Sequence, residues 1–248
     1  RKVNMNKTFN FTGSSIKANF AIKMDIEILQ TTEQNAYIKF ESNSDQIIVE
    51  HTENSLTISS KIDDKISSNI DNINSLSDLF VVALKVGIKS QDIKGIAKIF
   101  IPQNNNSSLN LKANNADIIS DAKINNLNLN INNGNITIKN SINDLDAKSN
   151  NCNFNIQGDT KNLKIDSNNG TIDITSDIEN LDIKSNNSNI TLTGNNKINN
   201  WIIKINNGII KINKKDFDGT IYHKENIINS GSGQGIIKII GSNIIEIK

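Results

Sequence analysis

An eighteen-residue repeat dominates this sequence and is the feature that most constrains its fold. The pair Asn-Asn recurs at positions 114–115, 132–133, 150–151, 168–169, 186–187 and 206–207. The interval is eighteen residues four times and then twenty, and the two extra residues fall within 195–200. A fixed period of this size is typical of an array in which each period is one structural repeat.

Apolar residues flank each Asn pair on alternate positions. A Leu or Trp stands five residues before the pair, and a second apolar residue follows it two positions later. A small residue comes directly after the pair, followed by alternating apolar residues such as Ile172 and Ile174. Two-residue alternation predicts strands, because successive side chains point to opposite faces. The Asn pair and its small residue predict a corner, since Asn and Gly tolerate positive φ.

These features predict an all-β fold, a single-stranded parallel β-helix (β-solenoid) with about eighteen residues per coil. Each coil would stack on an equivalent coil about 4.8 Å away, and a polar return of six residues would complete each coil. Stacked Asn side chains would form amide ladders, because each both donates and accepts. The expected ladder residues are Asn114, Asn115, Asn132, Asn133, Asn150, Asn151, Asn168, Asn169, Asn186, Asn187, Asn206 and Asn207.

Charges alternate in sign within the stacked columns. The second position of the unit holds Asp146, Lys164 and Asp182, and the fourth position holds Lys148, Asp166 and Lys184. Opposite charges on neighbouring strands stabilise a sheet, whereas like charges destabilise it. The alternation is therefore expected to help set the register of the coils.

The flanking segments complete the expected organisation. Alternating runs within 16–61 predict strands outside the eighteen-residue register, which begin or cap the solenoid. Apolar residues at three- and four-residue spacing predict an amphipathic helix over 66–86. The expected parts of one continuous domain are a β segment or cap (1–61), a helical insertion and linker (62–96), and the solenoid (97–248), with regular coils at 109–212 and a degenerate coil and cap at 213–248.

The predicted helix contains the most apolar stretch of the chain, around Leu79, Phe80 and Leu84. One interpretation is that it covers an end or side of the sheet. The other is that these three residues contact a partner protein or a membrane surface. No run of eighteen apolar residues occurs, so the stretch is too short to span a bilayer.

Residues that could carry chemistry are few. His51 and His223 belong to no metal-spaced cluster, and Gly231–Gly235 lacks the Lys-Ser/Thr of a phosphate loop. Cys152 occupies the small-residue position and Trp201 the leading Leu position, so both are expected in the core. The sequence predicts no catalytic residue, no metal and no cofactor. A net charge of +1 without a basic stripe gives no reason to expect nucleic acid as a partner.

The chain resembles a family of bacterial cell-envelope β-helix domains known as "putative adhesins", a domain of unknown function. The resemblance rests on the I-x-I-P strand before the coils (Ile99, Ile101, Pro102) and on the tandem L-x-I-x-S-N-N-G-x-I-x-I units from Leu109 onward. It implies a β-helix fold and brings no catalytic or ligand-binding residues with it.

The leading hypothesis is a non-enzymatic, adhesin-like structural or binding module whose partner is a cell-surface glycan or protein. It would lie outside the cell or in the cell envelope, anchored by a segment missing from this chain. One alternative is a carbohydrate-active β-helix enzyme, which would need clustered acidic residues and aromatic platforms. Another is an envelope sensor or regulatory domain that contacts its partner through the 66–86 helix.

Overall fold

The computed structural model describes residues 5–60, 93–103, 107–193, 200–213, 219–223, 226–230, 235–241 and 244–247. These residues form β-strands joined in one sheet, in which most neighbouring strands run parallel. The strands are β1 (Met5–Asn10), β2 (Ser15–Phe20), β3 (Lys23–Thr31), β4 (Tyr37–Ser42), β5 (Ile47–His51), β6 (Ser55–Ser60), β7 (Lys94–Pro102), β8 (Ser108–Ser120), β9 (Ile124–Ile138), β10 (Ile142–Ile156), β11 (Thr160–Ile174), β12 (Ile178–Leu192), β13 (Asn200–Asn207), β14 (Ile209–Ile212), β15 (Gly219–His223), β16 (Asn226–Ser230), β17 (Gly235–Gly241) and β18 (Ile244–Ile247).

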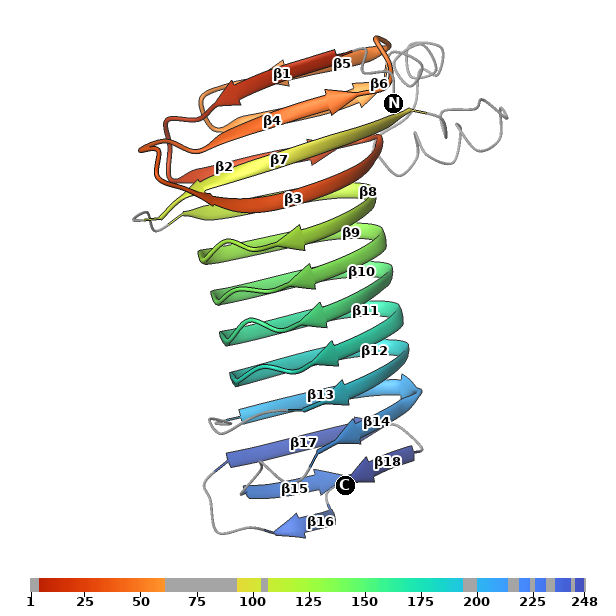
Figure 1. Ribbon diagram of the computed structural model, residues 1–248. Helices are drawn as coiled ribbons and strands as arrows, with labels where there is room; N and C mark the ends of the chain where they lie inside the picture. The colour runs from red at the N-terminus through yellow and green to blue at the C-terminus, as the bar shows by residue number, and fades with distance from the viewer. Residues whose placement is uncertain are drawn as a thin grey trace, which may run out of the picture.

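Strands β8 to β12 are the regular coils. Leu145 of β10 pairs with Leu127 of β9 and with Leu163 of β11, so neighbouring coils are offset by eighteen residues. The same offset joins β8 to β9 and β11 to β12. Figure 1 shows these coils stacked one above another along the long axis of the molecule. The prediction that equivalent residues of neighbouring coils stack on one another is confirmed. The arrangement is that expected of a β-solenoid.

Alternate residues of each coil point into a narrow interior. In β11 the side chains of Leu163, Ile165 and Ile172 are buried, whereas those of Lys164 and Asp166 between them are exposed. Burial of one such apolar side chain contributes about 1.5–3 kcal/mol. Because every coil repeats the pattern, the core is a set of apolar columns that run the length of the stack.

The connection between coils is shorter than the six-residue polar return expected from the sequence. Strand β9 ends at Ile138 and β10 begins at Ile142, so three residues lie outside the strands. Ile142 pairs with Ile124 and Thr160 in the neighbouring coils, and its side chain is buried. Each strand therefore begins within the expected polar return, before its leading Leu, because parallel pairing continues there.

The Asn-Asn corner bends each strand without ending it, and its third residue alternates in type. Ala116, Cys152 and Ser188 are buried, whereas the coils after them have Gly134 and Gly170 at φ 145° and 135°. A Cβ at Gly170 would lie 2.0 Å from the Cys152 carbonyl oxygen, and one at Gly134 would lie 1.8 Å from that of Ala116. Glycine is therefore required at both positions, because a Cβ there would collide with the backbone carbonyl of the preceding coil.

The N-terminal strands extend the stack beyond the repeat. Strand β2 pairs in parallel with the first half of β8, and β3 pairs with its second half. Ile16 thus joins the column of Leu109, and Ile26 joins that of Ile118. The first pair is 93 residues apart in sequence and the second 92, so this coil has an extra corner residue. The expectation that these strands lie outside the eighteen-residue register is confirmed.

Strands β6 and β7 form the next tier, on β2 and β3 respectively. The chain leaves β6 at Ser60 and re-enters β7 at Lys94, on the side where the regular coils have their Asn-Asn corner. The predicted helix over 66–86, with Leu79, Phe80 and Leu84, lies outside the described residues.

Antiparallel strands occur at both ends of the stack (Figure 1). At the N-terminal end β4 pairs antiparallel with β7, β1 with β4, and β5 with β6. At the C-terminal end β16 pairs antiparallel with β15. Lys7 on β1 and Glu50 on β5 are exposed, and charges on such strands oppose edge-to-edge aggregation.

The C-terminal part contains two further coils. Asn200 pairs with Asn180, so β13 and β14 follow β12 at an offset of twenty residues. Strands β17 and β18 pair in parallel with β13 and β14 and add a further coil. No helix within the described ranges is long and apolar enough to cross a membrane.

We expect Gly170→Ala to lower the free energy of unfolding by more than about 2 kcal/mol, because Ala is strained at positive φ and its Cβ would meet the Cys152 carbonyl oxygen. Thermal and urea unfolding followed by circular dichroism would measure the change. Cys152→Ala is the matched control, since Ala116 occupies the same position two coils earlier. An equal loss in both variants would contradict this account of the corner.

Candidate functional site

The twelve predicted ladder asparagines form two columns along the corner of the coils. Bonds of the first column join Asn132 to Asn114 at 3.0 Å, Asn168 to Asn150, Asn186 to Asn168 and Asn206 to Asn186 at 2.7 Å, and Asn150 to Asn132. Bonds of the second column join Asn133 to Asn115, Asn151 to Asn133, Asn169 to Asn151, Asn187 to Asn169 and Asn207 to Asn187 at 2.8–3.0 Å.

Every ladder bond has the same direction, with the Nδ2 of one Asn donating to the Oδ1 of the Asn one coil earlier. A net contribution of about 0.5–1.5 kcal/mol is typical of one such bond, and solvent exposure places these at the lower end. Each interior Asn uses one N–H and one oxygen lone pair within the ladder, so the corner contributes to the stability of the stack.

We expect Asn168→Ala to lower the free energy of unfolding by about 1–2 kcal/mol, because it removes one donated and one accepted bond in mid-ladder. Asn130→Ala is the control, since the Asn130 side chain is exposed and makes no hydrogen bond within the described part of the chain. Urea unfolding of both variants provides the measurement. A loss for Asn168→Ala no larger than that for Asn130→Ala would show that the ladder contributes nothing to stability.

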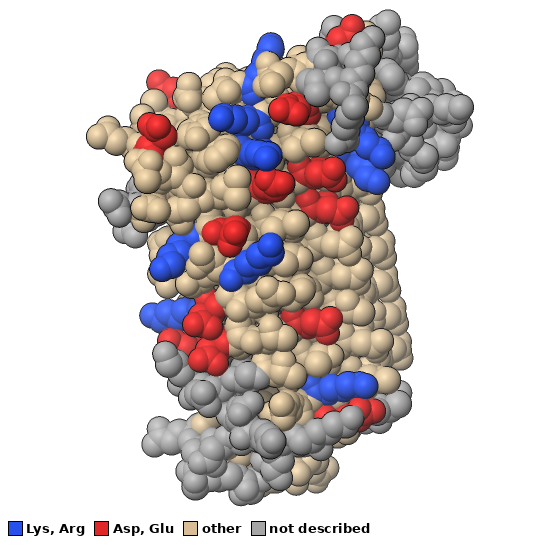
Figure 2. All heavy atoms as spheres, in the orientation of Figure 1, with Lys and Arg blue, Asp and Glu red and all other residues tan. Residues whose placement is uncertain are grey.

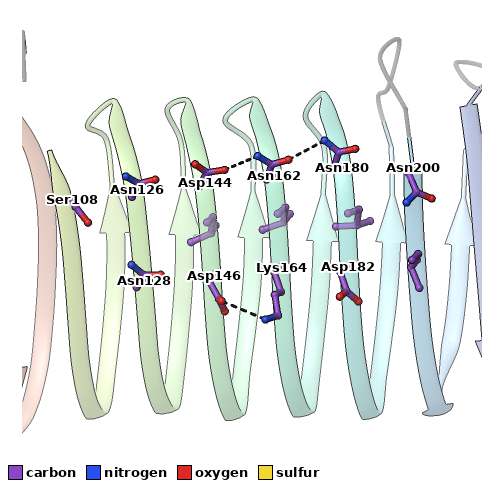
Figure 3. A pocket seen from close by; sticks show the side chains of 14 residues that line it. Ser108, Asn126, Asn128, Asp144, Asp146, Asn162, Lys164, Asn180, Asp182 and Asn200 are labelled. Carbon is purple, nitrogen blue, oxygen red and sulfur yellow. Dashed lines mark hydrogen bonds and ion pairs between the residues drawn. The ribbon is translucent and has the colours of Figure 1, made fainter. Parts of the chain in front are cut away.

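A polar groove of about 520 Å³ runs across the coils on the strand that precedes the corner. Its walls are two columns of outward-pointing residues that flank the leading Leu of each coil (Figure 3). The first column contains Ser108, Asn126, Asp144, Asn162, Asn180 and Asn200, and the second contains Asn128, Asp146, Lys164, Asp182 and Ile202. The Leu side chains point into the core, so their backbone forms the floor.

Some of the groove's polar atoms are held by neighbouring coils. Asn162 donates to Asp144 at 2.6 Å and Asn180 donates to Asn162 at 2.9 Å, which fixes part of the first column. Lys164 and Asp146 form an ion pair at 3.5 Å in the second column. Because both side chains are partly exposed, this pair contributes about 0–1 kcal/mol, and its main effect is to orient the two groups.

Two carboxylate oxygens in the groove have no partner within the described part of the protein. These atoms are Oδ1 of Asp146 and Oδ1 of Asp182, and both are shielded from solvent. An oxygen that water cannot reach is equally closed to a hydroxyl or amide of a ligand, so these two atoms are buried acceptors and not contact points of the groove.

The predicted charge alternation has different outcomes in the two columns. The register places Lys148, Asp166 and Lys184 in one column, as expected. Within the described residues, however, no ion pair joins them, whereas Lys164 pairs with Asp146 in the other column. Figure 2 shows acidic and basic side chains interspersed on the face in view, without a large patch of one sign.

The two histidines lie at the ends of the stack. The His51 ring packs against Phe9 and Phe11, with centroids 5.2 and 5.3 Å apart, and its Nε2 lies 3.0 Å from the Asn10 carbonyl oxygen. His223 Nε2 lies 3.0 Å from the Gly241 carbonyl oxygen. The described residues include no group of three or more His, Cys, Asp or Glu that could hold a metal ion.

Trp201 and Cys152 are core residues, as the repeat predicts. Trp201 is buried and its Nε1 donates to the Ile178 carbonyl oxygen at 3.1 Å. Cys152 is buried, its thiol donates to the Ile131 carbonyl oxygen at 3.5 Å, and burial raises its pKa to about 11. The neutral thiol is therefore the form that the folded protein favours.

The raised pKa of Cys152 predicts a loss of stability at alkaline pH. In the unfolded chain the thiol ionises near pH 9, so the stabilisation is complete below that pH and lost as pH rises to about 11. Unfolding titrations should show that wild type loses about 2 kcal/mol relative to Cys152→Ala between pH 8 and pH 11. A pH-independent difference between the two proteins would contradict the shift.

The groove is the feature that reasoning from sequence missed. From sequence alone, the alternation of Asp146, Lys164 and Asp182 indicates only the register of the coils. The sequence contains one signal for the groove, because the residue directly before the leading Leu or Trp is polar in every regular coil. The candidate contact residues Leu79, Phe80 and Leu84 lie outside the described residues, so they remain a prediction.

Comparison with known proteins identifies the fold and no family. No protein-family model matches the chain, and no curated protein matches it. A crystal structure from Parabacteroides merdae, named a "putative adhesin", is 16% identical, with a TM-score of 0.54 and coverage of 99% of this chain and 97% of that one. A "putative lipid binding protein" from Parabacteroides distasonis is 15% identical, with a TM-score of 0.56 and coverage of 99% and 98%.

The chain shares its fold with these two proteins. At this level of identity the likeness concerns the path of the backbone along almost the whole length of both chains. It does not transfer a ligand or a residue role, because function depends on site residues grafted on a fold.

Proposed function

We propose that this protein is a non-enzymatic, adhesin-like binding module of the bacterial cell surface. The observation that carries the proposal is the polar groove, which repeats the same two side-chain positions across five or more stacked coils. The names of the two structures with the same fold, an adhesin and a lipid-binding protein, support a binding role.

The architecture suits binding because the groove is preorganised. Its side chains project from strands that are hydrogen-bonded on both sides, and several are held by a neighbour in the next coil. A rigid surface loses little conformational entropy when a ligand binds, which improves affinity without requiring a deep pocket. A surface of this kind suits an extended, repetitive ligand better than a small compact molecule.

A binding panel tests the proposal. Purified protein would be exposed to glycans, peptidoglycan, lipid vesicles and host matrix proteins, and soluble reducing ends would be measured in the same samples. We expect saturable binding to at least one surface without release of reducing ends. Heat-unfolded protein is the control for nonspecific adsorption.

Three results would contradict the proposal. Release of reducing ends would favour the alternative of a carbohydrate-active β-helix enzyme. Absence of binding to every member of the panel would leave the protein without an adhesin-like role. Binding to a single signalling or membrane protein, abolished by Phe80→Ser with Leu84→Ser, would favour the sensor alternative.

A further inference from the structure

We propose that the protein docks on the surface of an anionic lipid bilayer through an exposed apolar patch with two lysines at the C-terminal end of the solenoid. The residues of this C-terminal patch are Lys204, Tyr222, Ile227, Ile236, Lys238 and Ile240. The patch begins beside Ile202, where the second column of the groove ends. It is a separate surface, so the inference goes beyond the proposed function.

The strand register places the patch residues on one outward face. Lys238 of β17 pairs with Tyr222 of β15, and Tyr222 pairs with Ile227 of β16. Ile237 and Ile239, which flank Lys238 along β17, are buried in the core. Because successive side chains of a strand point to opposite faces, Lys238 and its cross-strand partners point outward. Figure 1 shows these strands at the C-terminal end of the stack.

Exposed apolar side chains gather at this end of the molecule. Within the described residues the exposed large apolar side chains are Ile119 at 43%, Ile227 at 60%, Ile228 at 41% and Ile240 at 50%. All but Ile119 lie in β16 and β17. In the regular coils, by contrast, every outward position of the strand before the corner is polar or charged. Apolar side chains that gather on a surface mark an interaction site, whereas scattered ones do not.

The charge of the patch selects an anionic partner. Strands β13, β15, β16 and β17 contain Lys204 and Lys238 and no Asp or Glu. Both lysines are exposed, and neither forms an ion pair within the described part of the chain. The connecting segments 213–218 and 224–225 contain three Lys and three acidic residues, so they add no net charge. Lysines near an anionic bilayer strengthen binding to it.

The size and charge of the patch favour a bilayer over a protein partner. Four strands about 4.8 Å apart, with outward positions about 6.7 Å apart along each, cover about 200 Å². A stable protein interface buries about 800 Å² on each partner. A second copy placed on the patch by a two-fold axis would also bring lysines against lysines, which is unfavourable.

A bilayer meets both properties of the patch without requiring a complementary shape. Ile227 and Ile240 can enter the boundary between headgroups and acyl chains, where burial of apolar surface favours binding. Lys204 and Lys238 can extend their ammonium groups to the lipid phosphates, and Tyr222 can keep its hydroxyl among the headgroups. A contact of this size gives weak, reversible binding that depends on salt.

Vesicle flotation provides the first test. The full chain would be mixed with phosphatidylcholine vesicles that contain phosphatidylglycerol, and with vesicles of phosphatidylcholine alone. We expect a partition coefficient about tenfold or more higher on the anionic vesicles at low salt, and a smaller difference at high salt because salt screens the lysines. Equal binding to both vesicles, or no binding to the anionic ones, would overturn the inference.

Variants of the exposed isoleucines test the apolar contribution. Ile227→Asn and Ile240→Asn should each lower the partition coefficient on anionic vesicles about five- to tenfold, because each removes apolar surface from the contact. Ile119→Asn is the matched control, since Ile119 is exposed to a similar degree but lies outside the patch. Unfolding curves would establish that all three variants are folded. Equal losses in patch and control variants would contradict the assignment.

Variants of the lysines test the electrostatic contribution. Lys204→Gln with Lys238→Gln should remove most of the preference for anionic vesicles. Lys112→Gln with Lys148→Gln is the control, because these two lysines are exposed on outward positions of β8 and β10 and the change in net charge is the same. Loss of the preference in both pairs would show that net charge, and not the patch, attracts the protein to the bilayer.

Two further outcomes would overturn the inference. One is vesicle binding that none of the patch variants changes. The other is a dimer in sedimentation equilibrium that Ile227→Asn dissociates, which would assign the patch to a second copy of the chain. Binding of the groove to other members of the panel does not depend on these results, so the proposed function stands or fails separately.

Discussion

Parallel hydrogen bonding between coils eighteen residues apart is the interaction on which the rest of this protein depends. One coil buries only a few apolar side chains, and their contribution is smaller than the entropy lost when its backbone is ordered. Backbone hydrogen bonds and side-chain contacts shared with the coils on both sides offset this entropy loss, so the coils stabilise one another. Columns of Leu and Ile, the corner and the groove all follow from this stacking.

In the stack each side chain lies beside the residue at the same position of the next coil, and the sequence meets this constraint in two ways. Asparagine can stack on itself, because its amide donates to one neighbour and accepts from the other. Like charges cannot stack in this way, and Lys164 lies between Asp146 and Asp182. At the corner Gly170 lies between Cys152 and Ser188, because a Cβ at Gly170 would meet the carbonyl oxygen of Cys152. A two-coil alternation is thus imposed on an eighteen-residue repeat.

The same alternation connects structure to the proposed function. It places the carboxylates of Asp146 and Asp182 two coils apart in a groove whose walls are fixed by backbone pairing. A repetitive surface of this kind favours a repetitive ligand, and it can gain affinity by engaging many weak contacts along one chain. Binding strength would then be set by the number of coils more than by any single residue.

The sequence by itself determined the strands, the period, the ladders and the core positions of Trp201 and Cys152. It could do so because a fixed period identifies each residue's neighbour, eighteen positions away. Tertiary structure alone decided where the aperiodic strands lie. Strand β2 lies between β6 and the repeat, β3 lies between β7 and the repeat, and β17 lies between β13 and β15. Backbone hydrogen bonds do not depend on the identity of the side chains, so pairing between strands about ninety residues apart leaves no pattern in the sequence. The groove also required the structure, because its depth depends on which outward columns flank the Leu column in space.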